Sequence, residues 1–210
     1  IIRACNAVSK PVIVAAQMLL SMVNNPVPTR AETTDVANAV LDGADCVMLS
    51  EETAMGNYPV ETVRFMRQIA NKAEELLLER HDLKEPSEDE GLEEYLAYSA
   101  CLLASKTYAK AIVLHSMSGA SARLVSTRRP PQLIYGMTPE AEVIKHLNFS
   151  WGVQPTFVAD TTESSHLKRV ENFVEQASQF QRGETFILTA GQPKPGDQRR
   201  GTNLVKIYRK

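Results

Sequence analysis

Short, continuously apolar segments alternate with longer helix-forming segments along most of this chain, and this alternation restricts the folds that it can adopt. The first two apolar segments lie at 12–16 and 44–49. Both are too short for a typical helix, and their β-branched residues suit strands that are buried on both faces. A helix-forming segment follows each of them. Because parallel strands are joined by helical crossovers, residues 1–80 are predicted to form two parallel βα repeats.

The ends of the two helices predicted in this region carry local signals. Thr29 and Glu32 have the spacing of a capping box, in which each side chain binds a backbone amide at the start of the helix. Gly43 should end that helix, because glycine tolerates the left-handed conformation of the C′ position. Pro59 is placed as a first-turn proline after a loop at 50–58. The second helix is expected to bury apolar residues at helical spacing: Val63, Met66, Ile69, Ala73 and Leu76.

A polar, acidic stretch at 81–91 separates these repeats from a second series of alternating segments. We interpret it as a linker between a domain at 1–80 and a domain at 92–210. The second domain is predicted to be an open α/β sheet with helices on both faces. Its expected strands lie at 111–115, 132–136, 155–159, 184–189 and 203–208, and its expected helices lie at 92–108, before residue 129, at 140–147 and at 165–179.

The composition argues against several classes of protein. The chain has 210 residues, a formal net charge of −2 and a sequence pI of about 6.1, which indicate neither a nucleic-acid partner nor a membrane partner. No apolar run approaches the roughly 20 residues of a membrane-spanning helix. The three cysteines are far apart, so buried, reduced thiols in a cytosolic protein are expected. His115 and His146 are expected to be packing or surface residues, because neither has a second metal ligand at suitable spacing.

Four stretches of the first domain closely resemble one enzyme family. They are KPVIVAAQML at 10–19, NPVPTRAE at 25–32, DVANAVLDGADCVMLS at 35–50 and ETAMGNYP at 52–59. In this order they are similar to the seventh strand, the next helix and the eighth strand of the pyruvate kinase barrel. The second domain resembles the family more loosely, through its order of elements and its serine-rich loop. The resemblance implies α/β architecture: the end of a (β/α)8 barrel, followed by the regulatory C-terminal domain.

The resemblance to pyruvate kinases also implies an activity and an assembly. The family transfers a phosphoryl group between phosphoenolpyruvate and ADP in glycolysis, giving pyruvate and ATP, and uses Mg²⁺ and usually K⁺. The family's metal ligands lie on earlier barrel strands that this chain lacks, so the chain alone is expected to be inactive. A cytoplasmic homotetramer is implied, with Arg30 at a contact between the barrels of two subunits.

Three residues near the predicted strand ends depart from the family pattern. Ala16 replaces a threonine that assists proton delivery to the enolate, and alanine offers no donor. Leu20 replaces a glutamate. Glu51 replaces a glycine, so its carboxylate would repel an anionic substrate and its side chain could strain a turn built for glycine. Ser50 could hold a water or a proton near the substrate, or merely cap a turn.

These departures leave two interpretations open. The first is the C-terminal part of an active pyruvate kinase, which the intact barrel motif favours. The second is a catalytically weakened relative that acts as a regulatory or effector-binding subunit, which Ala16 and Glu51 favour.

The loop at 116–121 is the strongest binding candidate in the sequence. It joins a predicted strand to the start of a helix, which is a natural phosphate site. In the family this loop receives a phosphate of a sugar-phosphate effector, although Met117 and Ala120 stand here where basic residues often occur. The alternative is a solvated loop with ordinary surface charge. The expected effector-binding residues are Ser116, Ser118, Gly119 and Ser121, with Lys194, Arg199, Arg200, Gly201 and Thr202 from a second loop.

Overall fold

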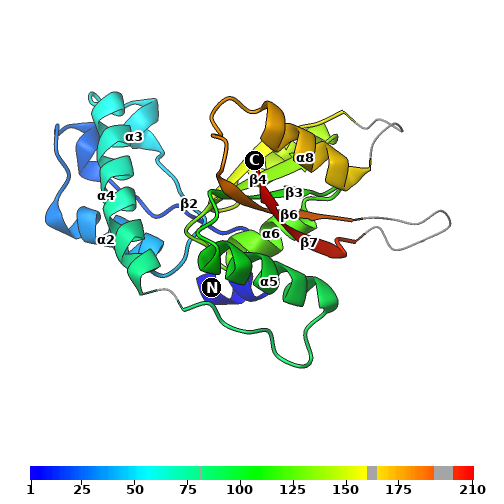
Figure 1. Cartoon of the computed structure of the whole chain (residues 1–210). Helices are drawn as coiled ribbons and strands as arrows, with labels where there is room; N and C mark the ends of the chain where they lie inside the picture. The colour runs from blue at the N-terminus through cyan, green and yellow to red at the C-terminus, as the bar shows by residue number, and fades with distance from the viewer. Residues whose placement is uncertain (81, 160–164, 192–200) are drawn as a thin grey trace. The chain divides into compact units, whose positions relative to one another are not determined.

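The structure is a computed structural model, and it describes residues 1–80, 82–159, 165–191 and 201–210. The chain divides into two compact units, Ile1–His81 and Asp82–Lys210, which we call unit 1 and unit 2 (Figure 1). Each unit has a hydrophobic core of its own. None of the helices in the described ranges is long and apolar enough to cross a membrane.

Unit 1 contains two short parallel strands and a series of helices. β1 and β2 pair with Ile13 opposite Cys46 and Val14 opposite Val47. The predicted order of strand, helix, strand and helix is confirmed, but each strand has only 2 residues. The helices α1 and α3 and the 3-10 helix η1 were not predicted. The elements are α1 (Ile2–Ala7), β1 (Ile13–Val14), η1 (Leu20–Val23), α2 (Arg30–Leu41), β2 (Cys46–Val47), α3 (Glu51–Ala54) and α4 (Pro59–Glu79).

The helix signals in unit 1 are confirmed. The Glu32 amide donates to the Thr29 hydroxyl over 3.3 Å, and the Thr29 amide donates to the Glu32 carboxylate over 2.8 Å, which completes the capping box. Gly43 follows α2 with a φ of +91°. Pro59 is the first residue of α4. Local spacing therefore predicted where α2 and α4 begin.

The buried stripe of α4 differs from the prediction, because Ile69 and Leu76 are only half-buried and Val63 is exposed. Val63 is 52% exposed, whereas Thr62, Met66 and Ala73 are buried. Thr62 lies one helical turn before Met66 on the same face, so it takes the place that the prediction gave to Val63. Its hydroxyl donates to the Tyr58 carbonyl over 2.7 Å, which allows a polar residue to be buried there. The core of unit 1 consists of Met18, Leu19, Met22, Val36, Ala39 and Met66.

Unit 2 is an open sheet of five strands in the order β5-β4-β3-β6-β7. The first four are parallel, and β7 runs antiparallel to β6. The predicted strands and helices are all present, with ends shifted by a few residues at most. They are α5 (Leu92–Lys106), β3 (Ala111–His115), α6 (Ala120–Thr127), β4 (Leu133–Thr138), α7 (Ala141–Leu147), β5 (Val153–Phe157), α8 (His166–Gln176), β6 (Thr185–Ala190) and β7 (Leu204–Arg209).

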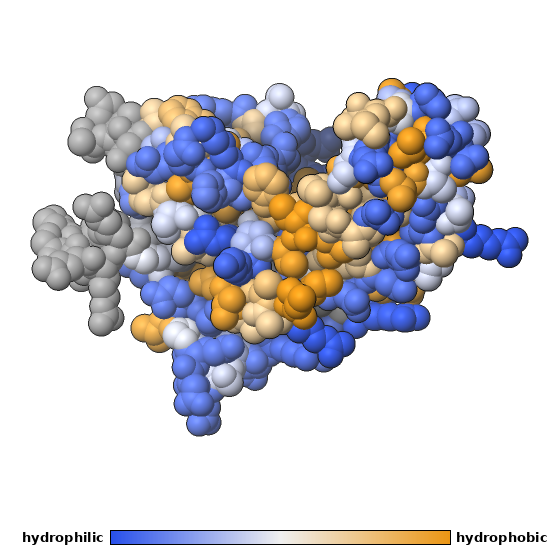
Figure 2. All heavy atoms as spheres, turned by 180° about the vertical axis from the view of Figure 1, so that it is seen from behind, coloured by the Kyte–Doolittle hydropathy of each residue, from blue (hydrophilic) through white to orange (hydrophobic). Residues whose placement is uncertain are grey.

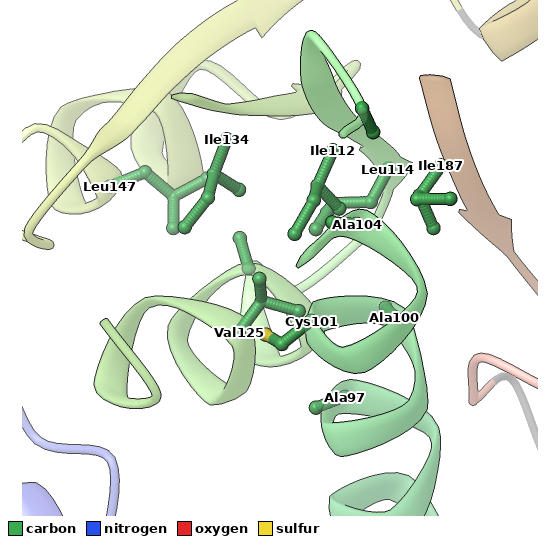
Figure 3. Packing of buried hydrophobic residues seen from close by; sticks show 12 residues of the cluster. Ala97, Ala100, Cys101, Ala104, Ile112, Leu114, Val125, Ile134, Leu147 and Ile187 are labelled. Carbon is green, nitrogen blue, oxygen red and sulfur yellow. The ribbon is translucent and has the colours of Figure 1, made fainter. Parts of the chain in front are cut away.

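Helices cover both faces of this sheet, as predicted. Alternate residues of a strand point to opposite faces. On one face, Ile112 and Leu114 pack with residues of α5, α6 and α7 (Figure 3). On the other face, Ala111 and Val113 pack with residues of α8. The central strand β3 is therefore buried along its whole length.

The cysteines are all free, but only one of them is buried. Cys101 is a residue of α5 that faces the core, where burial raises the pKa of its thiol to about 12 in spite of the nearby Arg128. A thiol of this kind is inert as a nucleophile. Cys5 and Cys46 are only half-buried, so the expectation of buried thiols is wrong for these two. Neither belongs to the small core of unit 1.

The surface carries apolar side chains in places. Figure 2 shows a face on which hydrophilic residues predominate and hydrophobic residues gather between them. In unit 1, Ile13 of β1 is 44% exposed and Met48, which follows β2, is 43% exposed. Exposed apolar residues on strands mark a surface that other elements can cover.

We expect the amides of β1 to exchange with solvent at least about 100-fold faster than those of β3. β1 has one neighbouring strand and an exposed side chain, whereas β3 is paired on both edges and fully buried. Hydrogen exchange measured by NMR on the 210-residue chain at micromolar concentration tests this. Equally strong protection of both strands would contradict it.

Glu32 ties η1 to α2. Its carboxylate accepts from the Ser21 amide over 2.7 Å and from the Ser21 hydroxyl over 2.5 Å, in addition to its bonds with Thr29. Burial alone would raise the pKa of Glu32, but the hydrogen bonds from Ser21 and Thr29 outweigh burial and lower it. A lowered folded-state pKa stabilises the fold above the unfolded value of about 4.3, and this contribution disappears as the pH falls through the folded value.

Glu32→Gln should therefore lower the free energy of opening of α2 by about 1–2 kcal/mol at pH 7. Asp35→Asn is the matched control, because Asp35 is exposed on the same helix. It should change that free energy by less than about 0.5 kcal/mol. Hydrogen exchange of the α2 amides measures both variants, and Glu32→Gln should converge with wild type as the pH falls through the lowered pKa of Glu32. A Glu32→Gln variant with unchanged exchange at pH 7 would show that the carboxylate is dispensable.

Candidate functional site

The first candidate site lies where β1 and β2 end. The two strands are parallel, so their carboxyl ends share one edge, which is the edge that carries chemistry in barrel enzymes. After β1 the chain passes through Ala16 and Gln17, which are both exposed. Gln17 has a φ of +43°. A residue other than glycine in this conformation costs about 1–3 kcal/mol and persists only where its surroundings hold it.

Ser50 lies at the same edge, after β2. It is exposed, and its hydroxyl makes no capping hydrogen bond to α3. Its backbone carbonyl accepts from the Ala54 amide over 3.0 Å. The hydroxyl therefore does not cap the turn, which was the alternative to a role near a substrate.

The structure places the three departures from the family pattern as follows. Ala16 is exposed and presents only a methyl group. Leu20 is half-buried at the first position of η1. Glu51 is exposed at the first position of α3 and does not have a positive φ. The expected strain at Glu51 is therefore wrong, because a helical backbone accepts any side chain.

Glu52 is the buried polar residue of this edge, with a side chain that is 1% exposed. One carboxylate oxygen accepts from the Leu19 amide over 3.1 Å, and the other accepts from the Ser50 amide over 2.7 Å. Both oxygens are thus satisfied by backbone, as a buried carboxylate requires.

Arg30 is exposed at the first position of α2. It makes no ion pair with any residue in the described ranges. A cation is poorly placed at a helix N-terminus, so no interaction within unit 1 accounts for this residue.

The second candidate site lies at the carboxyl ends of the strands of unit 2. From β3 the chain builds the sheet outward through β4 to β5, and then returns to place β6 on the other side of β3. Open α/β sheets bind ligands in the crevice at such a point of reversal. The 116–121 loop leaves β3 at this crevice.

The loop at 116–121 turns tightly into α6. Gly119 has a φ of +74° and precedes the first residue of α6. A Cβ at this position would lie 2.9 Å from a Val143 methyl, so glycine is required. The hydroxyl of Ser118 is 3.4 Å from the Ala120 amide, and the carbonyl of Ser118 accepts from Arg123 over 3.2 Å. Arg123 therefore places a cation beside the loop.

The structure brings this loop together with the start of β7. The hydroxyls of Ser121 and Thr202 are 2.5 Å apart. Ser116 is buried, and its amide donates to the Met137 carbonyl over 2.9 Å, so its backbone belongs to the sheet. Gly201 is exposed. Lys194, Arg199 and Arg200 lie outside the described residues.

Two histidines lie at the same end of the sheet. His115 is the last residue of β3 and is buried, as the prediction of a packing residue requires. Its ring stacks on that of His166 with centroids 4.1 Å apart. His166 begins α8, and its Nδ1 is 3.0 Å from the Gly191 carbonyl. The pair therefore connects β3, α8 and the residue that follows β6.

A pocket of about 440 Å³ lies next to Thr202, between α5 and the chain that enters β7. Its walls combine apolar side chains with one exposed carboxylate. The lining residues are Leu92, Glu93, Tyr95, Leu96, Ser99, Gly201, Thr202 and Asn203.

Sequence reasoning missed three residues of these sites. Glu52 lies within the matched stretch at 52–59, so its position was available but its burial was not. Arg123 lies four residues after Gly119, about one turn into α6. This spacing is the sequence signal that could have placed it beside the loop. His166 had no signal, because its partner His115 is distant in sequence. Among the residues that the structure describes, no group of three or more histidines, cysteines or acidic residues could hold a metal ion.

Comparisons with known proteins agree with this architecture. The family model "Pyruvate kinase, barrel domain" matches residues 1–63, and "Pyruvate kinase, alpha/beta domain" matches residues 94–208. Pyruvate kinases of Clostridium acetobutylicum and Staphylococcus saprophyticus are 39% and 41% identical to this chain, and each alignment covers 99% of it. These alignments cover 44% and 36% of the two relatives.

A solved pyruvate kinase from Cryptosporidium parvum has the same fold, with a TM-score of 0.83 and 35% identity. It is matched over 99% of this chain and 42% of its own. The chain thus spans less than half the length of the relatives that it matches. It carries a segment of the barrel domain followed by the alpha/beta domain, and it belongs to the pyruvate kinase family, a family of phosphotransferases.

Proposed function

We propose that this chain is the C-terminal part of a pyruvate kinase that transfers a phosphoryl group between phosphoenolpyruvate and ADP in glycolysis. The observation that supports it most is the strand-end edge of unit 1, where the exposed Ser50 has a hydroxyl that is not used as a cap. In this proposal residues 1–80 form the end of the catalytic barrel, 81–91 a linker, and 92–210 the regulatory domain.

The groups that this chain carries determine which part of the reaction we assign to it. Phosphoryl transfer depends on positioning and on neutralisation of charge, which the family achieves with Mg²⁺ and K⁺. The described residues offer no cluster of metal ligands, so we assign none of them to these ions. Unit 1 would contribute the Ser50 hydroxyl and the backbone of the edge beside Ala16 to a site that is completed by other strands.

A second function, that of a catalytically weakened subunit which binds an effector, is favoured by Ala16 and Glu51. The methyl group of Ala16 can neither donate nor relay a proton, and loss of a positioned proton relay costs on the order of 100-fold or more in rate. Glu51 is exposed at the same edge, where its carboxylate would repel an anionic substrate.

We propose that the crevice of unit 2 binds a phosphorylated sugar. The α6 N-terminus, the hydroxyls of the 116–121 loop and the Arg123 guanidinium would surround one phosphate, and Thr202 lies beside them. Lys194, Arg199 and Arg200 would clamp a second phosphate. We further propose a cytoplasmic homotetramer with Arg30 at a subunit contact, which agrees with its exposure and with its lack of an ion pair among the described residues.

The catalytic proposal is tested with a coupled assay. The 210-residue chain should show no pyruvate kinase turnover with Mg²⁺ and K⁺, because the chain lacks the other groups of the site. In a longer protein that contains this chain, Ala16→Thr should raise kcat at least about tenfold if only the proton step is impaired. Robust turnover by the 210-residue chain would contradict the proposal. A folded Ala16→Thr variant without any gain would favour the regulatory alternative.

The effector proposal is tested by calorimetry on the 210-residue chain with fructose 1,6-bisphosphate. Arg199→Ala combined with Arg200→Ala should abolish detectable binding while the chain stays folded. Lys168→Ala is the control, since Lys168 is an exposed cation of unit 2 that pairs with Glu171. Raising the salt concentration should weaken the wild-type affinity, because exposed charges are screened. A double variant that binds as tightly as wild type would show that these arginines do not clamp the ligand.

A further inference from the structure

The buried carboxylate of Glu52 links the segment that follows β1 to the segment that follows β2. Leu19 follows β1 and Ser50 follows β2, and η1, α2 and β2 lie between the two residues in sequence. Each oxygen of Glu52 accepts from one of these two amides. We infer that Glu52 is the positioning residue of the catalytic edge, holding the two strand ends in one arrangement. This inference rests on the function proposed above.

The first argument is that the two amides bound by Glu52 lie close in sequence to the groups at the edge. The Leu19 amide lies two residues after Gln17, whose φ of +43° is unfavourable for a residue with a side chain. The Ser50 amide belongs to the residue that presents the hydroxyl. One carboxylate therefore holds the turn after β1 and the candidate catalytic serine together.

The second argument is that the pairing of the short sheet does not extend as far as these two amides. β1 and β2 pair over only two positions, and the last described backbone bond between them is from the Met48 amide to the Val14 carbonyl, over 2.9 Å. Beyond that bond, the Glu52 side chain hydrogen-bonds to the backbone of both segments. Hydrogen bonds to a charged group are stronger than those between neutral groups, so a carboxylate is suited to holding a strained turn.

The third argument is the burial of the Glu52 side chain and the close packing of its backbone. Glu52 is 1% exposed, so water cannot replace its partners. A Cβ atom added at Gly56 would lie 2.4 Å from the backbone carbonyl oxygen of Glu52. The backbone that follows α3 therefore packs closely against the backbone of Glu52. Glycine at that position allows the close approach. The backbone of Glu52 is thus closely packed, and its buried carboxylate accepts from the two amides.

The direct test is hydrogen exchange of the Leu19 and Ser50 amides in the 210-residue chain. Glu52→Gln keeps the shape of the side chain but replaces one acceptor oxygen with a donor, so at least one amide loses its partner. Exchange of that amide should rise on the order of 10- to 100-fold. Glu51→Gln is the matched control, because it removes the adjacent, exposed carboxylate, and it should leave both amides unchanged. Unchanged exchange of both amides in Glu52→Gln would overturn the inference.

A second variant covers the case in which Glu52→Gln fails to fold. Glu52→Asp keeps the charge but is one methylene shorter, so it cannot reach both amides. One amide should stay protected while the other exchanges faster. If both amides in Glu52→Asp kept the protection that they have in wild type, the inference would also be overturned.

The functional readout separates positioning from stability. In a longer, active protein that contains this chain, Glu52→Gln should lower kcat at least about tenfold with a much smaller change in KM for phosphoenolpyruvate, at a temperature where the protein remains folded. Asp35→Asn, away from the edge, should leave both constants unchanged. An unchanged kcat in Glu52→Gln would refute the positioning role. If wild type itself has no transferase activity, the proposed function fails, while the exchange experiment still decides whether Glu52 holds the edge.

Discussion

Hydrogen bonding between neighbouring parallel strands governs both units, because a strand edge without a neighbour leaves its backbone groups to the solvent. β3 has a partner on each side and is buried throughout, so the loops at its end start from a rigid base. β1 has a single described partner and pairs over two residues. Unit 1 therefore depends on side chains for order that unit 2 obtains from its sheet.

Two glutamates supply that order in unit 1, by the same chemistry. Glu32 binds the amides of Ser21 and Thr29, and Glu52 binds the amides of Leu19 and Ser50. Each carboxylate joins a segment that follows β1 to the start of a helix. A carboxylate can do this better than an amide side chain, since both of its oxygens accept and the negative charge is favoured at a helix N-terminus.

Signals that are local in sequence were predictable, and contacts between distant segments were not. The capping box at Thr29 follows from a spacing of three residues, and the apolar run of β3 gave its bounds directly. Leu19, one of the two partners of Glu52, is 33 residues away from it, and no spacing rule connects them. The stacking of His115 on His166 is equally non-local. Val63 shows the limit of periodicity, because a threonine that bonds its own backbone can take an apolar position.

The two candidate sites also differ in what completes them. The crevice of unit 2 is bounded by elements of that unit alone: the end of β3, the start of α8, the residue after β6 and the start of β7. The sugar-phosphate binding that we propose for it would therefore depend on this chain. Among the described residues, the edge of unit 1 offers a hydroxyl and a held turn but no cluster of metal ligands, and phosphoryl transfer needs charges to be neutralised. The catalysis that we propose for that edge would therefore draw on groups beyond the described residues, so the binding proposed for the crevice could persist where catalysis is lost.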